Sequence, residues 1–319
     1  MSQHATQTPS PPAATAVPCG RSTRRIRGIY IANLVAQAGI VVTGAIVRIT
    51  ESGLGCPTWP ECVDGSIIPT STQEEEWQKY VEFGNRLLTF VLLFLAIAAV
   101  VAALVDRRRR ARAGLPARPA LVALAFVPIV GTVGQAVLGG ITVLTGLHPF
   151  IVGAHFLLSM LIIAGVVALV ARSGDDGDST TEWLVPRPVR LLAWVLLAAS
   201  AAVVVVGVLV TSTGPHSGDS TAERLAWDPR TVAWLHADLV LLFLGLLVGL
   251  LVALTVTHAP WRARRRAYLL LGIALAQGLV GYTQYFTGLP ELLVVIHVIG
   301  AVLVWIAVLF IPPALRTRT

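Results

Sequence analysis

The chain has 319 residues, of which 55% are hydrophobic and 13% are charged. A soluble domain carries about 25% charged residues, so this composition excludes an ordinary soluble protein and predicts a protein embedded in the lipid bilayer. The net charge of +7 would suit nucleic acid, but the basic residues lie between long apolar blocks. That placement is typical of membrane topology signals, and we expect no nucleic-acid partner.

Eight apolar blocks are long enough to cross a bilayer, which takes roughly 20 residues as a helix. They lie at 28–48, 83–105, 121–143, 150–171, 189–211, 231–253, 267–287 and 291–312. No block contains a central proline, and no charged stretch between blocks is long enough for a soluble domain. The predicted fold class is therefore an all-α integral membrane protein with eight transmembrane helices.

The positions of the basic residues predict the orientation. If the N-terminus is cytoplasmic, all but five of the 24 lysines and arginines fall in cytoplasmic segments. Cytoplasmic loops carry this excess, so we expect a multi-pass protein of the bacterial plasma membrane with both termini inside. The loops at 49–82, 144–149, 212–230 and 288–290 then lie outside.

Polar segments divide the chain into parts. Residues 1–27 predict a disordered cytoplasmic tail; their Ser-, Pro- and Ala-rich composition leaves an organelle transit peptide as the alternative. The polar stretch 172–188 reads as a cytoplasmic linker. It separates a four-helix bundle at 28–171 from a second at 189–312, and 313–319 forms a short cytoplasmic tail.

The sequence contains one internal repeat. Residues 135–155 read QAVLGGITVLTGLHPFIVGAH and residues 277–297 read QGLVGYTQYFTGLPELLVVIH, with seven of 21 positions identical. Each copy covers the third helix of its half, a tight Thr-Gly-Leu turn and the start of the fourth helix. Because four spans separate the copies, both halves have the same orientation. This predicts two pseudo-symmetric bundles related by a parallel repeat.

Three histidines lie about six residues into a helix from its outer end, roughly 9 Å deep: His155, His236 and His297. His236 and His297 fall on the second and fourth helices of one bundle, where facing imidazoles predict a bis-histidine haem site. A single buried histidine is more often a packing residue. Two at one depth in one bundle favour ligands, because ionisable groups are costly inside a membrane.

The first bundle differs at one position. His155 is present, but the counterpart of His236 is Asn85, a poor iron ligand. Glu82 lies one turn before Asn85 on the same helix face, which indicates a reactive site with an open iron position. Alternatively, Glu82 is a first-turn acid favoured by the helix dipole, with Arg86 as its surface partner.

Three further residues lie in or beside the first predicted outside loop. Arg48, at the outer end of the first helix, can pair with a haem propionate or extend its side chain to the interface. Cys56 and Cys62 lie in an oxidising location that permits a disulfide. The loop at 49–82 is long enough to cap the first bundle.

Several of these segments together resemble the haem A synthases, inner-membrane enzymes of cytochrome oxidase assembly. The matching segments cover essentially the whole membrane domain: TGAIVRITESGLGCPTWPEC (43–62), EFGNR (82–86), TGPHSGD (213–219), the helix start at His236 and the two repeats. The resemblance implies oxidation of the C8 methyl of haem O to a formyl group by successive hydroxylations. The product would be haem A for cytochrome oxidase.

The resemblance also implies roles for residues. His236 and His297 would hold haem b as an electron carrier. His155 would be the axial ligand of haem O in the first bundle, with Glu82 as the catalytically important carboxylate; Asn85, Arg48 and Arg86 complete the candidate site. Cys56 and Cys62 would form a disulfide that takes part in haem transfer. The implied partners are a haem O synthase and an electron donor that the sequence does not identify; a homo-oligomer is compatible with this picture.

The chain departs from the family pattern in two places. Where Glu-x-x-His-Arg is usual, it reads Glu82-Phe-Gly-Asn85-Arg86, and residues 212–230 lack a second cysteine pair. Asn85 either leaves an open iron position, leaves His155 to hold the substrate alone, or alters the activity. The main alternative function is a non-enzymatic di-haem cytochrome b, which predicts bis-histidine ligation in both halves. A transporter of haem or a small molecule is the third, and predicts discontinuous helices.

Overall fold

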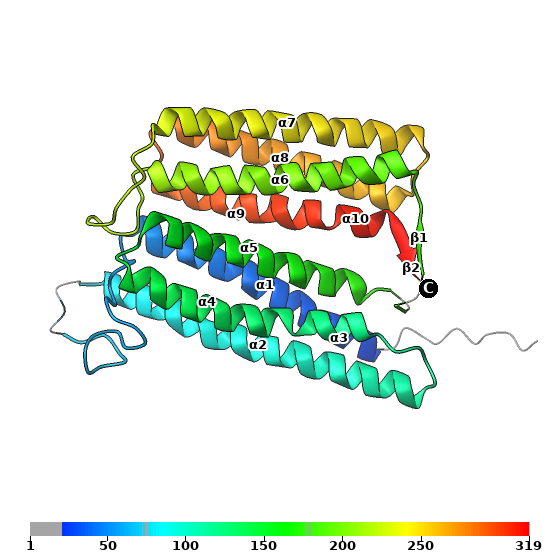
Figure 1. Ribbon diagram of the computed structural model, residues 1–319, viewed down its shortest axis with the longest axis horizontal. Coiled ribbons are helices and arrows are strands. Elements are labelled where there is room, and N and C mark those ends of the chain that lie inside the picture. The colour runs from blue at the N-terminus through cyan, green and yellow to red at the C-terminus, as the bar shows by residue number, and fades with distance from the viewer. Residues whose placement is uncertain (1–20, 72, 74–75, 176, 179, 319) are drawn as a thin grey trace, which may run out of the picture.

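The computed structural model describes residues 21–71, 73, 76–175, 177–178 and 180–318 (Figure 1). Within these residues, eight helical segments are long and apolar enough to cross a membrane, as predicted. The elements in chain order are α1 (Arg21–Ile49), α2 (Gln78–Arg112), α3 (Pro119–Ala125), α4 (Val127–Leu144), α5 (Pro149–Arg172), β1 (Thr181–Trp183), α6 (Arg187–Thr213), α7 (Pro229–Val256), α8 (Trp261–Phe286), α9 (Glu291–Leu309), α10 (Ile311–Ala314) and β2 (Arg316–Arg318).

The helices exceed the predicted spans at several ends. α1 begins at Arg21, so residues 21–27 are helical and not part of a disordered tail; residues 1–20 of the predicted tail lie outside the described residues. α2 runs from Gln78 to Arg112, beyond both ends of the predicted 83–105 span. The hydropathy pattern locates the apolar centre of a helix, whereas charged end turns continue the backbone hydrogen bonding without contributing to that pattern.

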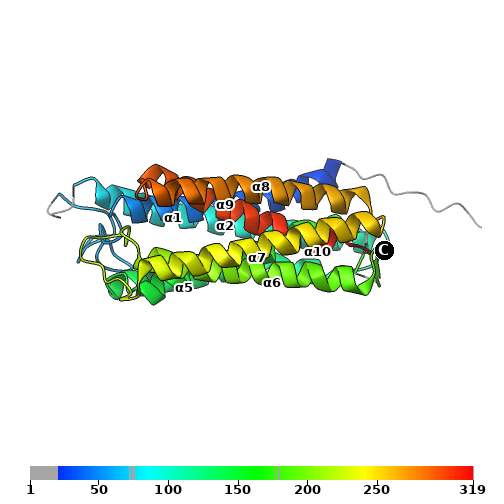
Figure 2. The same ribbon diagram turned by 90° about the horizontal axis from the view of Figure 1, so that it is seen from above.

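The helices lie side by side, with α1 to α5 in one group and α6 to α9 in the other (Figures 1 and 2). The groups meet where α5 and α1 contact α9 and where α5 contacts α6. The loops α1–α2 and α6–α7 share one end of the molecule, here called the long-loop end. Residues 113–118, the 173–186 segment and the C-terminus lie at the other, the tail end. The symmetry axis between the two groups stays a prediction.

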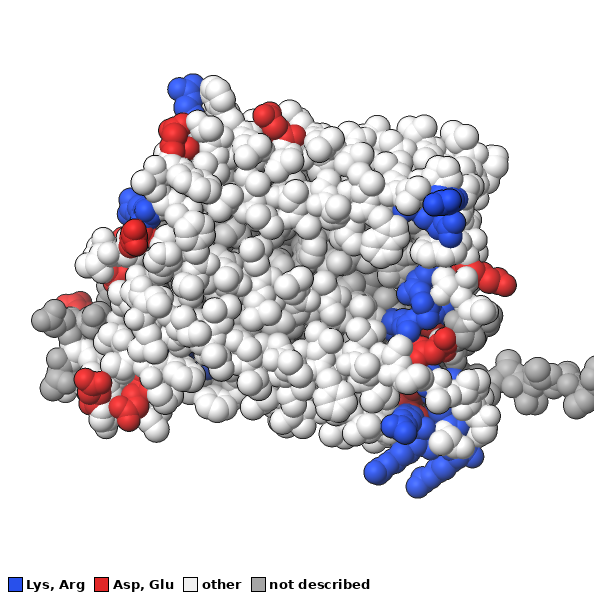
Figure 3. Space-filling model, viewed as in Figure 1, with Lys and Arg blue, Asp and Glu red and all other residues white. Residues whose placement is uncertain are grey.

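Charge follows the same division. The face in Figure 3 shows an uncharged band between two charged ends, with most of its lysine and arginine side chains at the tail end. This distribution agrees with eight apolar spans crossing a bilayer. Which end faces the cytoplasm stays a prediction from the positive-charge rule.

The third span is broken into α3 and α4. The break is at Phe126, whose N–H donates to the carbonyl of Ala123 at 3.2 Å. Pro128 follows in the first turn of α4 and has no N–H to donate to the preceding turn, so the helix cannot continue unchanged. The same cause separates α9 from α10 at Phe310, ahead of Pro312. Both breaks lie towards the tail end and not at the middle of a span.

The repeated Thr-Gly-Leu turns have the same backbone in both copies, as their sequence predicts. Gly146 and Leu147 have φ values of 60° and 59°, and Gly288 and Leu289 have 80° and 61°. The Leu147 N–H donates to the Thr142 carbonyl at 2.9 Å, and the Leu289 N–H to the Gln284 carbonyl at 2.8 Å. These bonds satisfy carbonyls that the ending helix leaves free, and each turn reverses the chain into the next helix.

The tightly packed core lies away from the histidines. In the second group, the buried residues of α8 end at Ala274 and those of α9 begin at Val302. His297 and the end of α8 that faces it therefore lie beyond the dense packing. The most deeply buried residues of α8 and α9 therefore lie on the tail-end side of His297.

Candidate functional site

Each of the three histidines lies against a glycine on the preceding long helix. A Cβ atom built on Gly139 of α4 would lie 3.2 Å from Cε1 of His155 on α5. The corresponding distances are 3.1 Å from Gly207 on α6 to His236 on α7, and 3.1 Å from Gly281 on α8 to His297 on α9. Any larger residue would push the ring, so the glycines let each imidazole lie against a neighbouring backbone. A glycine that contacts a histidine ring in this way is called a glycine seat.

Two of these histidines are also fixed through their own backbone. Gln135 Nε2 donates to the His155 carbonyl at 3.0 Å, and Gln277 Nε2 donates to the His297 carbonyl at 2.8 Å. The repeated Gln–His pair therefore makes the same contact in both halves. It ties the third helix of each half to the turn of the fourth that carries the imidazole.

The imidazoles leave polar atoms without protein partners. Nδ1 of His155, His236 and His297 is buried without a hydrogen-bond partner within the described residues, although the His236 ring also interacts with the backbone of Val203. Buried polar atoms are nearly always paired, so these rings suit a ligand role. His236 and His297 lie on α7 and α9 of the same helix group.

Three histidine–glycine pairs are present, and the fourth pair that the repeat predicts has no histidine. Asn85 on α2 would be the counterpart of His236, and Gly44 on α1 is the glycine that corresponds to Gly207. Asn85 Oδ1 instead accepts a hydrogen bond from Thr43 Oγ at 2.7 Å. A Cβ atom at Gly44 would have no neighbour within 4 Å. Asn85 is therefore turned to α1 by a hydrogen bond, and the glycine beside it seats no imidazole.

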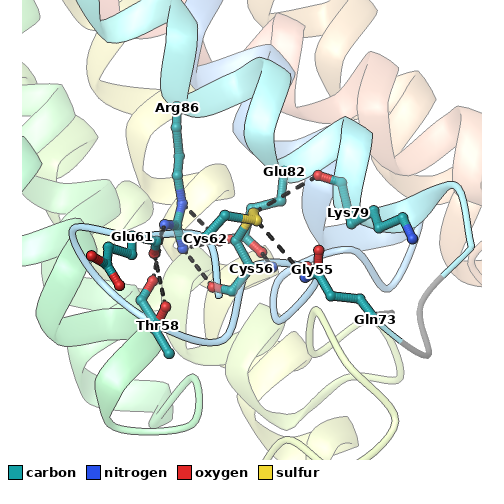
Figure 4. A network of polar contacts seen from close by, with 9 residues as sticks. All are labelled: Gly55, Cys56, Thr58, Glu61, Cys62, Gln73, Lys79, Glu82 and Arg86. Carbon is teal, nitrogen blue, oxygen red and sulfur yellow. Dashed lines mark hydrogen bonds and ion pairs between the residues drawn. A yellow bond between two sulfur atoms is a disulfide. The ribbon is translucent and has the colours of Figure 1, made fainter. Parts of the chain in front are cut away.

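Glu82 and Arg86 lie three residues before and one residue after Asn85, at the long-loop end of α2 (Figure 4). Glu82 Oε1 pairs with Arg86 Nη2 at 2.6 Å, and Glu82 Oε2 accepts the Cys56 N–H at 2.6 Å. Arg86 also donates to the carbonyls of Cys56, Thr58 and Glu61 at 2.6, 3.0 and 3.1 Å. Both members of the ion pair thus bind the loop 56–62. Arg86 is therefore more than the surface partner of Glu82 that the alternative interpretation expected.

The loop held in this way is closed by a disulfide between Cys56 and Cys62, and both cysteines have no exposed surface. The predicted pairing is thus present. Trp59 of the same loop packs on α4, where a Cβ at Gly140 would lie 2.5 Å from the indole. Because the adjacent Gly139 seats His155, the loop covers α4 beside this histidine, as expected of a cap on the first bundle.

Arg48 makes contacts that the sequence did not indicate. Its guanidinium donates to the carbonyls of His216 and, at 2.7 Å, Thr211, both in the other helix group. Close by, the Gly53 N–H donates to the Gly218 carbonyl at 2.8 Å. Arg48 therefore ties the two halves at the long-loop end. Among the described residues its Nη1 has no partner, which leaves one donor for the predicted contact with a propionate.

His216, in the α6–α7 loop, has its Nε2 3.0 Å from the Leu289 carbonyl. The ring thus joins the α6–α7 loop to the second Thr-Gly-Leu turn. Sequence reasoning did not find this contact, and it did not find the glycine seats either. The repeated glycines Gly139 and Gly281 were a usable signal, since both survive in a stretch where two thirds of the positions differ.

Residues 27–309 match the sequence model of the COX15-CtaA family, described as cytochrome oxidase assembly protein. The chain belongs to this family.

Its relatives include proteins named heme A synthase. That of Lysinibacillus sphaericus is 32% identical over 46% of this chain and 44% of its own length, and that of Geobacillus kaustophilus is 31% identical over 44% and 40%. That of Sinorhizobium fredii is 26% identical over 88% and 87%. The chain therefore aligns with less than half the length of the first two and with most of the third.

Proposed function

We propose that this protein is a haem A synthase, a membrane oxidoreductase that converts the C8 methyl of haem O to a formyl group. The family and the names of its relatives support this activity. The observation that carries the proposal is the asymmetry of the two halves. One half has two imidazoles that each lie against a glycine; the other has one, with Asn85 and the Glu82–Arg86 pair at the remaining position.

In the second half, His236 and His297 would hold haem b. When bound there, haem b supplies one-electron transfer. The chain's own contribution is orientation: Gly207 and Gly281 let the imidazoles lie flat against α6 and α8, and Gln277 fixes the turn that carries His297. The unpartnered Nδ1 atoms support the fit.

In the first half, His155 would bind the iron of the substrate haem O from one side. The opposite side would face Asn85, whose side chain amide is engaged with Thr43. The iron position there is then open. Glu82 is close in sequence to this position, but both of its carboxylate oxygens bind the disulfide loop and Arg86. We propose that Glu82 affects the reacting methyl in one of two ways. It acts indirectly through its hydrogen bonds with Arg86 and Cys56, or it acts directly after these bonds break.

The remaining expectations concern partners and location. We propose a bacterial plasma membrane protein with both termini in the cytoplasm and the haem sites towards the outer face. A haem O synthase would supply the substrate, with the Cys56–Cys62 disulfide taking part in the transfer. The electron donor is unidentified, and a homo-oligomer is compatible with the proposal.

The alternative function, a di-haem cytochrome b without enzyme activity, needs a second imidazole in the first half. Asn85 does not supply one. The transporter alternative needs helices that break at mid-membrane, whereas both observed breaks lie towards the tail end. The structure therefore favours the enzyme over either rival.

Haem extraction tests the proposal. Membranes that contain this protein and a haem O synthase are extracted, and the haems are separated and identified by mass. Haem A or its hydroxylated intermediate, absent from a vector control, is the expected result. Haem O that remains unchanged, in a preparation where the protein is folded and carries haem b, would favour the electron carrier instead.

A further inference from the structure

Two adjoining grooves follow the broken third span at the tail end. The first, of about 520 Å³, lies between α3, α5 and β2 and ends at Arg172, Arg316 and Arg318. The second, of about 370 Å³, continues between α4 and α5 and is lined by apolar residues and one glycine. Ala123 and Val127 line both grooves. Together they form one apolar channel with arginines at its outer end.

The small sheet explains why two of the arginines face this channel. β2 pairs with β1 so that Arg316 lies opposite Trp183 and Arg318 opposite Thr181. Side chains two residues apart in a strand point to the same face, and along β2 the two arginines are half-buried while Thr317 is exposed. The sheet therefore presents both guanidiniums on one face, at the mouth of the groove that they line.

The charges at the mouth are only partly compensated. Arg172 Nη2 lies 3.3 Å from Asp178, whose other oxygen accepts the Ala120 N–H. Arg316 and Arg318 have no carboxylate within 4.0 Å in the described part of the chain, although Asp175 acts on both at longer range. Nε of Arg318 is buried without a hydrogen-bond partner. Burial, together with Arg318, lowers the pKa of Arg316, so an anion placed here would relieve a real electrostatic cost.

The position of the groove decides the class of ligand. It runs along membrane-spanning segments, so its apolar walls face lipid chains, while its arginines lie at the tail end where the spans leave the bilayer. Guanidinium groups bind phosphate oxygens by paired hydrogen bonds. A free phosphate would use the arginines but leave the apolar channel without an occupant.

We propose that this groove binds one anionic phospholipid, with its phosphate against Arg316 and Arg318 and one acyl chain along Ala123 and Val127. Basic residues at a membrane surface attract anionic lipid by about fivefold each, so two of them give a preference of about 25-fold. The lipid would join the C-terminal strand to α3 and α5. It would do so far from the histidines, whatever reaction they support.

Native mass spectrometry of the full-length protein tests this. The protein is released from micelles that contain phosphatidylglycerol or phosphatidylcholine with the same acyl chains. We expect wild type to retain phosphatidylglycerol at least tenfold more than phosphatidylcholine. Arg316→Gln with Arg318→Gln should abolish that preference and leave the backbone pairing of β2 intact. The matched control, Arg107→Gln with Arg108→Gln, removes the same charge from exposed positions on α2 and should behave as wild type.

A third variant tests the apolar part. Ala123 is exposed on α3 and lines both grooves, so Ala123→Trp should fill the channel without disturbing the core and should reduce retention of both lipids. Equal retention of the two lipids by wild type would overturn the proposal, and so would an equal loss in the control pair. Full phosphatidylglycerol binding by Ala123→Trp, with displacement by millimolar inorganic phosphate, would show a headgroup site only and would also overturn it.

Discussion

Replacing Arg86 by methionine tests whether the Glu82–Arg86 pair holds the disulfide loop closed. The substitution keeps much of the side-chain length but removes two bonds to Glu82 and three to the carbonyls of Cys56, Thr58 and Glu61. It also removes the cation paired with Glu82, whose side chain is 7% exposed and which keeps its bond from the Cys56 N–H. Both effects favour opening of the loop.

The magnitude follows from burial. Removing one member of a buried ion pair costs roughly 3–5 kcal/mol. Arg86 is 23% exposed, so water replaces part of the loss and we take about 3 kcal/mol. Cys56 and Cys62 have no exposed surface, so a water-soluble reductant reaches the disulfide only when the loop opens. If opening is in rapid equilibrium, reduction should be about 100-fold faster in Arg86→Met.

The assay is the rate of disulfide reduction in micelles, followed by trapping free thiols with a maleimide and measuring the intact mass. Arg230→Met is the matched control, because Arg230 is an exposed arginine on α7 that lies over the ring of Trp234. A rate for Arg86→Met within threefold of the control would refute the reasoning. Adding Glu82→Gln to Arg86→Met should recover part of the protection, since the carboxylate that lost its arginine is then neutral.

The remaining predictions concern the glycine seats. Asn85→His is expected to fold and to raise the number of low-spin bis-histidine haems per chain, because a ring has room beside Gly44. The visible absorption spectrum measures this number, and an unchanged number would show that Gly44 is not a glycine seat. Gly281→Ala should lower haem b content several-fold, since its Cβ would lie 3.1 Å from the His297 ring, whereas Gly278→Ala on the same helix meets nothing within 4 Å and should keep it. Equal haem b content in the two alanine variants would contradict the seat.

Hydropathy and charge predicted the membrane class and the eight spans, because each span is a local property of about 20 residues. The repeat likewise predicted the Thr-Gly-Leu turns, whose backbone depends on a glycine and its neighbours. The C-terminal strand was missed. Residues 313–319 were expected to be a free tail, but β2 pairs with Thr181–Trp183, and three polar residues carry no periodic signal for so distant a partner.

The candidate site divides in the same way. Spacing along single helices identified the histidines, Glu82 and Asn85. The contacts that position these side chains join distant segments: Gly207 with His236, Glu82 with Cys56, and Arg48 with the carbonyls of the other half. Such contacts depend on how helices and an irregular loop pack. A sequence pattern alone does not report that packing.

The central claim is that the two halves divide the work, with haem b held by one and haem O oxidised in the other. Haem content and identity, measured together in membranes that contain a haem O synthase, test it most directly in His155→Ala and His297→Ala. We expect His155→Ala to keep haem b and to make no haem A, and His297→Ala to lose haem b. Normal haem A output from His155→Ala, or an equal loss of haem b from both variants, would contradict the account.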